Sequence, residues 1–116
     1  MRVPVLRTHC EAVTIECERP ITEHEVREIL SRAPGVKIVD DRANNYFPMP
    51  VDSTGQDEVL VGRIRKDLSD PSGHSVTMFV AADQLLKGAA LNAIQIAEYL
   101  LPRDAAPPRK LAHEMA

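Results

Sequence analysis

The N-terminal segment contains two side chains suited to chemistry on a small acid, those of Arg2 and His9. An arginine guanidinium is planar and always charged, and it binds a carboxylate through two parallel hydrogen bonds. A histidine imidazole gives and takes protons near neutral pH. Extended chain between them would span roughly 23 Å, so they meet only if the chain bends, and Pro4 is a suitable place for a bend. Spacing alone favours a simpler interpretation, in which Arg2 is solvated and His9 ends a strand without a chemical role.

A second group of candidates begins a helix expected over residues 84–101, which Asp83 caps and Pro102 ends. Its first turn holds Gln84 and Lys87, and free backbone N–H groups there attract anions by about 0.3–1 kcal/mol each. The alternative is that both side chains face solvent, while Gly88 and nearby alanines permit close helix packing.

The elements that position these residues can be read from the periodicity. Residues 11–18 alternate between apolar and polar side chains, which predicts a half-buried strand. Thr22 and Glu25 form a capping box for a short amphipathic helix that Pro34-Gly35 ends. Further strands are expected at 36–39, 58–65 and 76–82, with a polar surface loop over 40–57 and a turn at 70–73.

The strands are joined by connections of different kinds, so the sequence predicts an α+β fold with a mixed, mostly antiparallel sheet and helices packed on one face. Gly62 predicts a bulge or a close backbone approach. Adjacent strand residues point to opposite faces, so His9 is not expected to activate Cys10, which is interpreted as structural. The Arg63–Lys66 cluster fits a salt-bridged strand end better than a phosphate site.

Composition excludes several classes of function. The chain of 116 residues has 44% apolar residues but no Trp, two Phe and two Tyr, which fits one domain with an aliphatic core. A net charge of −3 with mixed signs argues against a nucleic-acid partner. No apolar run is long enough for a membrane span, and no secretory signal is visible, which predicts a cytoplasmic protein. Cys10 and Cys17 are expected to be free thiols, and the four histidines lack the spacing of a metal site.

Three blocks in the same order resemble aspartate-semialdehyde dehydrogenases. They are RVPVLRTHCEAVTIECE at 2–18, VGRIRKDLSDPSG at 61–73 and DQLLKGAALNAIQIAEYLL at 83–101. The resemblance runs over residues 1–101 and is weakest at 36–57. It implies that residues 1–101 are the second half of the catalytic and dimerisation domain, with the fold of the C-terminal domain of glyceraldehyde-3-phosphate dehydrogenase-like enzymes. Residues 102–116 are expected to be a disordered tail.

By the same resemblance, Arg2 binds the substrate carboxylate, His9 is the catalytic acid and base, Gln84 lies beside the nicotinamide of NADP, and no metal is used. The implied reaction reduces β-aspartyl phosphate to aspartate semialdehyde in lysine, threonine and methionine biosynthesis, in a homodimer or homotetramer. The family's glycine-rich turn, cysteine nucleophile and phosphate-binding lysine have no counterpart here, so the isolated chain is expected to be inactive.

Two other interpretations remain open at this point. The strand-helix-strand unit at 14–39 also fits a small oligomeric amino-acid-binding or regulatory module, in which Arg2 serves a bound carboxylate without a reaction. The chain also fits a purely structural dimerisation piece. If the chain is a fragment of the dehydrogenase domain, its unpaired strand edges predict self-association, with Val59, Val61 and residues 76–80 as the expected contacts. A strictly monomeric chain would instead favour the regulatory module.

Overall fold

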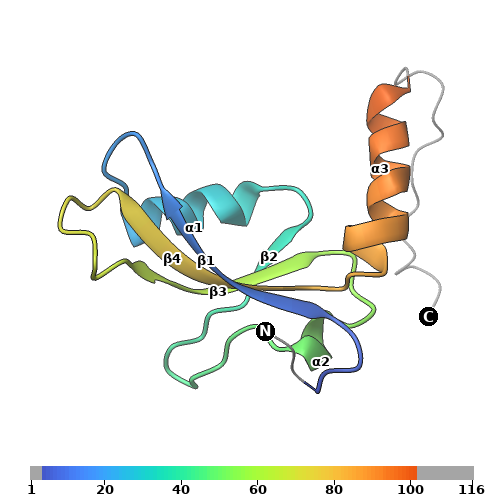
Figure 1. Ribbon diagram of the computed structural model, residues 1–116, viewed down its shortest axis with the longest axis horizontal. Coiled ribbons are helices and arrows are strands. Elements are labelled where there is room, and N and C mark those ends of the chain that lie inside the picture. Colours follow the sequence, from blue (N-terminus) through green and yellow to red (C-terminus); the bar gives the residue numbers. More distant parts are fainter. Residues whose placement is uncertain (1–3, 102–116) are drawn as a thin grey trace.

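The computed structural model describes residues 4–101, and the fold is built on one four-stranded sheet with the strand order β1-β4-β3-β2 (Figure 1). In chain order the elements are β1 (His9–Glu16), α1 (Glu23–Arg32), β2 (Val36–Ile38), α2 (Pro50–Ser53), β3 (Val59–Lys66), β4 (Ser75–Ala82), the π-helix η1 (Leu86–Ala90) and α3 (Leu91–Leu100). Arg2 and the expected tail at 102–116 lie outside the described residues.

The sheet is mixed and mostly antiparallel, which confirms the predicted fold class. β1 pairs with β4 along its whole length, from His9 opposite Ala82 to Glu16 opposite Ser75. β3 is antiparallel to β4, and only the short β2 runs parallel to β3. Because β3 and β4 are the two inner strands, the free sheet edges belong to β1 and β2.

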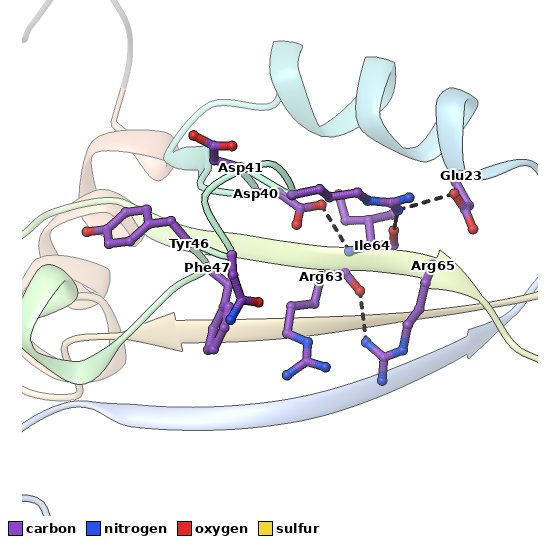
Figure 2. A pocket seen from close by; sticks show the side chains of 10 residues that line it. Glu23, Asp40, Asp41, Tyr46, Phe47, Arg63, Ile64 and Arg65 are labelled. Atoms are coloured by element: carbon purple, nitrogen blue, oxygen red, sulfur yellow. Dashed lines mark hydrogen bonds and ion pairs between the residues drawn. The ribbon is translucent and has the colours of Figure 1, made fainter.

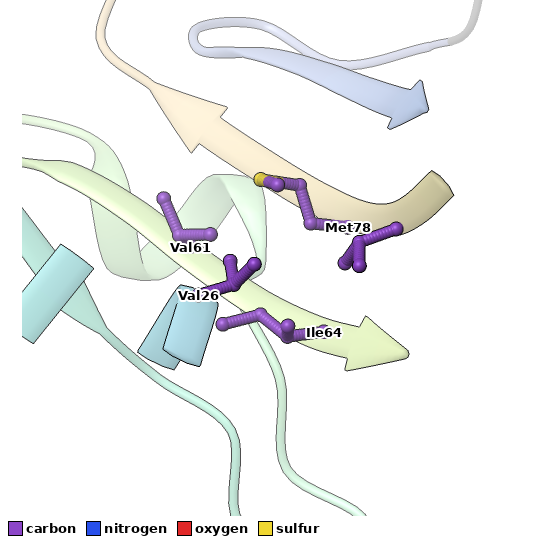
Figure 3. Close-up of a cluster of buried hydrophobic side chains, with 5 residues drawn as sticks. Val26, Val61, Ile64 and Met78 are labelled. Carbon is purple, nitrogen blue, oxygen red and sulfur yellow. The ribbon is translucent and has the colours of Figure 1, made fainter. Parts of the chain in front are cut away.

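The core lies between α1 and one face of the sheet. Val26 of α1 packs among β3 and β4 side chains (Figure 3), and the buried members of this cluster are Val26, Val61, Ile64, Val76 and Met78. The capping box is present, because Thr22 Oγ1 accepts from Glu25 N–H and Glu25 accepts from Thr22 N–H. The contact role expected for Val59, Val61 and residues 76–80 is therefore wrong for Val61 and Val76, which are 3% and 0% exposed beneath α1.

A bulge interrupts the pairing of β3 with β4 between Gly62 and Arg65. A Cβ atom at Gly62 would lie 2.0 Å from the carbonyl oxygen of Val39, so the backbone approach that the sequence suggested is real. Arg63 follows with a φ of 50°, a value rare for residues other than glycine. The bulge bends β3 and turns its N–H groups toward Asp40.

The segment 40–57, which was expected to be a surface loop, is partly helical and partly buried. It contains α2, and Pro48 and Ser53 are fully buried. The prediction failed because proline and serine are common in loops, while their burial here depends on contacts with distant segments such as the hydroxyl of Thr8.

The expected helix over 84–101 begins differently from the prediction. Residues 86–90 form η1, in which Gly88 N–H bonds to Asp83 O and Ala90 N–H bonds to Leu85 O, five residues back. α3 then extends away from the sheet rather than covering its face (Figure 1). No helix within residues 4–101 is long and apolar enough to cross a membrane.

Candidate functional site

The structure brings two of the three candidate residues to one end of the sheet. His9 is the first residue of β1 and is exposed, and its pairing with Ala82 sets it beside the end of β4. Gln84 follows that end by two residues. The backbone N–H of Thr8 donates to Gln84 Oε1 over 2.6 Å, although the two residues are 76 positions apart in the chain. The third candidate, Arg2, lies outside the described residues.

The chain that leads to His9 is bent rather than extended. It bends at Pro4, where a bend was expected, and again at Leu6 and Arg7. Thr8 then has a φ of 86° and is buried. A β-branched residue with positive φ is strained, by about 1–3 kcal/mol for such conformations, and persists only where its surroundings impose it. The approach to His9 is therefore a tightly constrained segment.

Hydroxyl groups next to α2 supply one part of that constraint. Ser53 Oγ donates to Thr8 Oγ1 over 3.1 Å, and the hydroxyl oxygens of Thr8 and Thr54 are 3.0 Å apart. Ser53 is 0% exposed, so its bond to Thr8 is shielded from water, whereas Thr54 is exposed. Sequence reasoning missed these residues, because nothing in the polar run at 53–54 indicates a partner 45 residues earlier.

Asp83 supplies the other part of the constraint on the chain before His9. It is 0% exposed, and its Oδ2 atom accepts from Arg7 Nη2 and from Gly55 N–H, each over 2.7 Å. Its Oδ1 atom accepts from Leu85 N–H over 3.0 Å. Asp83 is nevertheless not the helix cap that the sequence predicted, because η1 begins at Leu86 with Leu85 as its N-cap and without a side-chain capping bond. Burial favours the neutral acid, but the hydrogen bonds from Gly55, Arg7 and Leu85 outweigh burial and hold the pKa of Asp83 below its usual value. The carboxylate is therefore charged when buried, and it joins three segments of the chain.

Lys87, the other candidate in this region, is engaged within the C-terminal helices. Its Nζ atom donates to Gln95 Oε1 on α3. α3 continues directly from η1, so its first N–H groups do not form an open helix N-terminus. The anion site that the sequence suggested here has no geometric support.

Cys10 lies next to His9 in sequence, but the alternation of β1 directs the two side chains to opposite faces of the sheet. Desolvation raises the pKa of its thiol, so the thiolate needed by a nucleophile is disfavoured. Cys10 and Cys17 are both free. Within residues 4–101 no group of three or more His, Cys, Asp or Glu side chains could hold a metal ion.

A separate pocket of about 320 Å³ lies between the N-terminal end of α1, the loop after β2 and the bulge of β3 (Figure 2). Charged groups in and around it are mostly paired with one another. Arg27 binds Asp40, and Arg42 donates to Glu23 and to the carbonyl oxygen of Ile64. A hydrogen bond from Lys66 N–H and the nearby Arg42 lower the pKa of Glu23.

The Arg63–Lys66 cluster borders the same pocket. Arg63 stacks over the ring of Phe47 with 5.1 Å to the ring centroid, and Arg65 Nη1 donates to Arg63 O. Both guanidinium groups thus interact with neighbouring groups of the fold, which supports the structural interpretation of the cluster.

Within residues 4–101, Gln84 has one polar group that could hold part of a nicotinamide dinucleotide. Thr8 fixes the carboxamide oxygen of Gln84, which leaves the Nε2 amide as the group that can donate to a ligand. The pyrophosphate does not fit: α1 begins with Glu23 and Glu25 and is closed by its capping box, and η1 precedes α3.

The fold and this site define a class of protein. Residues 1–87 match the family model described as semialdehyde dehydrogenase, dimerisation domain. The chain therefore belongs to the semialdehyde dehydrogenase family. More particularly, its curated relatives are aspartate-semialdehyde dehydrogenases, among them those of Synechocystis sp., 54% identical over 103 residues, and Aquifex aeolicus, 48% identical over 101 residues.

These alignments cover most of this chain but a minor part of each relative. They include 89% of the chain and 30% of the Synechocystis protein, and 87% of the chain and 29% of the Aquifex protein. The chain thus spans about 30% of the length of the curated relatives it matches, and corresponds to their C-terminal part.

Solved structures agree. Aspartate semialdehyde dehydrogenase II from Vibrio cholerae, complexed with ASA, superposes with a TM-score of 0.79 at 42% identity, over 90% of this chain and 30% of that one. A probable aspartate-semialdehyde dehydrogenase from Pseudomonas aeruginosa superposes with a TM-score of 0.72 at 35% identity, over 84% of this chain and 28% of that one. The expected glyceraldehyde-3-phosphate dehydrogenase-like fold is confirmed, and the family match weighs against an unrelated amino-acid-binding module.

Proposed function

We propose that this chain acts as the C-terminal part of an NADP-dependent aspartate-semialdehyde dehydrogenase. The complete enzyme would reduce β-aspartyl phosphate to aspartate semialdehyde, with release of phosphate, in the biosynthesis of lysine, threonine and methionine. The observation that carries the proposal is that His9, paired with Ala82, and Gln84, bonded to Thr8, lie at the same end of the sheet in a chain whose relatives carry this name.

Each candidate residue has a separate task in this proposal. His9, exposed at the start of β1, moves the proton at the reacting carbonyl group, and general acid and base help of this kind typically contributes about 10²–10⁴-fold to the rate. Arg2 orients the substrate through its carboxylate. Gln84 donates from Nε2 to the nicotinamide carboxamide, and the bound cofactor supplies the hydride.

The remaining chemistry requires groups outside the described residues. Neither cysteine of the chain suits the role of nucleophile: Cys10 faces away from His9 and has a raised thiol pKa, and Cys17 lies beyond the end of β1, away from His9. The pyrophosphate also needs a binding turn that residues 4–101 do not provide. The complete active site would therefore form only when this chain joins the rest of the enzyme.

We also infer a homodimer or homotetramer in the cytoplasm. The name of the matching family model, a dimerisation domain, supports the oligomer. The two free thiols, Cys10 and Cys17, suit a reducing compartment.

A chimeric enzyme tests the proposal. Residues 1–103 replace the matching part of the Synechocystis relative, and reduction of NADP by aspartate semialdehyde and phosphate is measured. We expect turnover in the chimera and none in the truncated relative without the replacement. A chimera that folds and assembles like the parent enzyme but gives no turnover would overturn the proposal.

A further inference from the structure

The ion pair of Arg7 and Asp83 links the two segments that carry the candidate site residues. Arg7 lies two residues before His9, and Asp83 lies directly before Gln84. Arg7 Nη2 and Asp83 Oδ2 are 2.7 Å apart, and Asp83 also holds Gly55 N–H, next to the hydroxyl groups that bind Thr8. The buried carboxylate of Asp83 thus connects three parts of the chain: the segment that precedes His9, the backbone next to Gln84 and the segment that follows α2.

Fold stability is a poor explanation for this pair. β1 and β4 are already joined by eight paired residues, and the apolar core lies beneath α1 among other side chains. Only Asp83 of the pair is fully buried, whereas Arg7 is 38% exposed, and even buried ion pairs often stabilise a protein no better than apolar side chains of the same volume. In addition, Arg7 Nε is buried without a hydrogen-bond partner within residues 4–101, which is a cost to the folded state.

The geometry that the pair imposes is nevertheless specific. Thr8 has positive φ, and its N–H is directed at Gln84 Oε1 rather than at a strand neighbour. This conformation determines the direction in which the chain enters β1 at His9, and it also fixes the carboxamide of Gln84. Strained residues of this kind persist where surrounding contacts impose them, commonly at functional sites.

We propose that Arg7 and Asp83 form a positioning pair, which holds Thr8 in its left-handed conformation and so sets His9 and Gln84 in register for the reaction. The role in catalysis rests on the proposed function, whereas the control of Thr8 and Gln84 does not. Neither residue is assigned contact with substrate or cofactor.

The test compares two isosteric substitutions at similar ion pairs. Asp83→Asn replaces one acceptor oxygen with a donor that faces the donors of Arg7 and Gly55. Asp40→Asn is the matched control, because Asp40 is also buried, pairs with Arg27 and accepts from a backbone N–H, that of Ile64. Arg7→Gln is a second test variant that leaves Asp83 in place; because Arg7 is 38% exposed, this change alters buried surroundings less than Asp83→Asn does.

The first measurement is amide NMR of the full 116-residue chain and requires no activity. We expect hydrogen exchange at the Thr8 amide to be at least about 10-fold faster in Asp83→Asn and Arg7→Gln, with a shifted Gln84 side-chain amide signal, because loss of the pair releases both groups. In Asp40→Asn both signals should stay as in the parent chain. Unchanged Thr8 exchange and Gln84 signals in the two test variants would overturn the proposal.

The second measurement uses the chimeric enzyme at a temperature where all variants are fully folded. We expect kcat to fall about 10–100-fold in Asp83→Asn and Arg7→Gln, with KM for aspartate semialdehyde within about threefold, since a misplacement of about 1 Å costs on this order. Asp40→Asn should keep the parent kcat. Equal kcat values in test and control variants would overturn the catalytic role, whereas an inactive parent chimera would overturn the proposed function and leave the NMR result to decide the positioning of Thr8 and Gln84.

Discussion

The position of His9 depends on residues that contact no ligand in the proposed reaction. The positive φ of Thr8, the hydroxyl of Ser53 and the carboxylate of Asp83 are separated widely in sequence, yet they converge directly before His9. Catalytic side chains depend on such support, because orientation errors of a fraction of an ångström reduce the rate.

The first prediction at this scale separates proton transfer from binding. In the chimeric enzyme, His9→Asn should lower kcat by about 10²–10⁴-fold with little change in KM, since asparagine cannot carry the proton. Steady-state kinetics provide the measurement. His24→Asn is the control, because His24 is 82% exposed on α1 and lies away from the site.

Arg2→Lys should mainly raise KM, because a lysine cannot make the bidentate contact with a carboxylate. The same steady-state assay applies, with Arg19→Lys as an exposed control. Small and equal effects of His9→Asn and Arg2→Lys would show that both residues have structural roles only.

A third prediction concerns acid stability. Burial alone would raise the pKa of Asp40, but hydrogen bonds from Arg27 and from the N–H groups of the bulge keep it below the usual 3.8. A carboxyl group with a lowered folded-state pKa stabilises the fold above its unfolded pKa, and this contribution is lost as the pH falls through the folded pKa. Urea unfolding between about pH 5 and pH 2 should therefore show a flatter pH dependence for Asp40→Asn. The exposed Asp57→Asn should follow the parent chain.

At the scale of elements, local sequence patterns predicted the features that depend on neighbouring residues. The alternation of apolar and polar residues predicted β1, a capping box predicted the start of α1, and Gly62 predicted the bulge. The sequence could not reveal the burial of Ser53, the positive φ of Thr8 or the Arg7–Asp83 pair, since each depends on contacts between segments 45 to 76 residues apart. Residue type and position made His9 and Gln84 candidates, but their roles came only from family resemblance, and their proximity follows from the register of β1 on β4.

The bulge supplies a prediction for this scale. Gly62→Ala should lower the free energy of unfolding by about 1–3 kcal/mol, because the new Cβ would collide with Val39 O and the Pro48 ring. Gly88→Ala is the matched control: its Cβ would meet Gln84 Cβ at an ordinary 3.6 Å, and alanine favours the helix. Equal losses of stability, measured by denaturant titration, would contradict the close approach at Gly62.

At the scale of the whole molecule, α3 is the element that does not pack against the sheet. Its side chains Ile94, Ile96, Tyr99 and Leu100 are 52%, 53%, 87% and 75% exposed, and the helix stands away from the sheet (Figure 1). A helix with this many large apolar side chains normally buries them against another element. The exposed apolar surface of α3 is suited to contact with a second chain. It is equally suited to contact with another part of a longer enzyme, since the chain spans about 30% of the length of its curated relatives.

The isolated chain should therefore self-associate, with α3 as the main contact rather than the strands buried beneath α1. Light scattering over a concentration series should show a mass that rises above that of one 12.8 kDa chain at micromolar concentration. Substituting Ile94→Lys and Ile96→Lys together should shift this rise to higher concentration, because charged side chains resist transfer from water into a contact. Ile29→Lys is the matched control, since Ile29 is similarly exposed at 59% but lies on α1. If the double substitution leaves the association curve unchanged, the contact lies elsewhere, and the free edge of β1 becomes the surface to which self-association must be assigned.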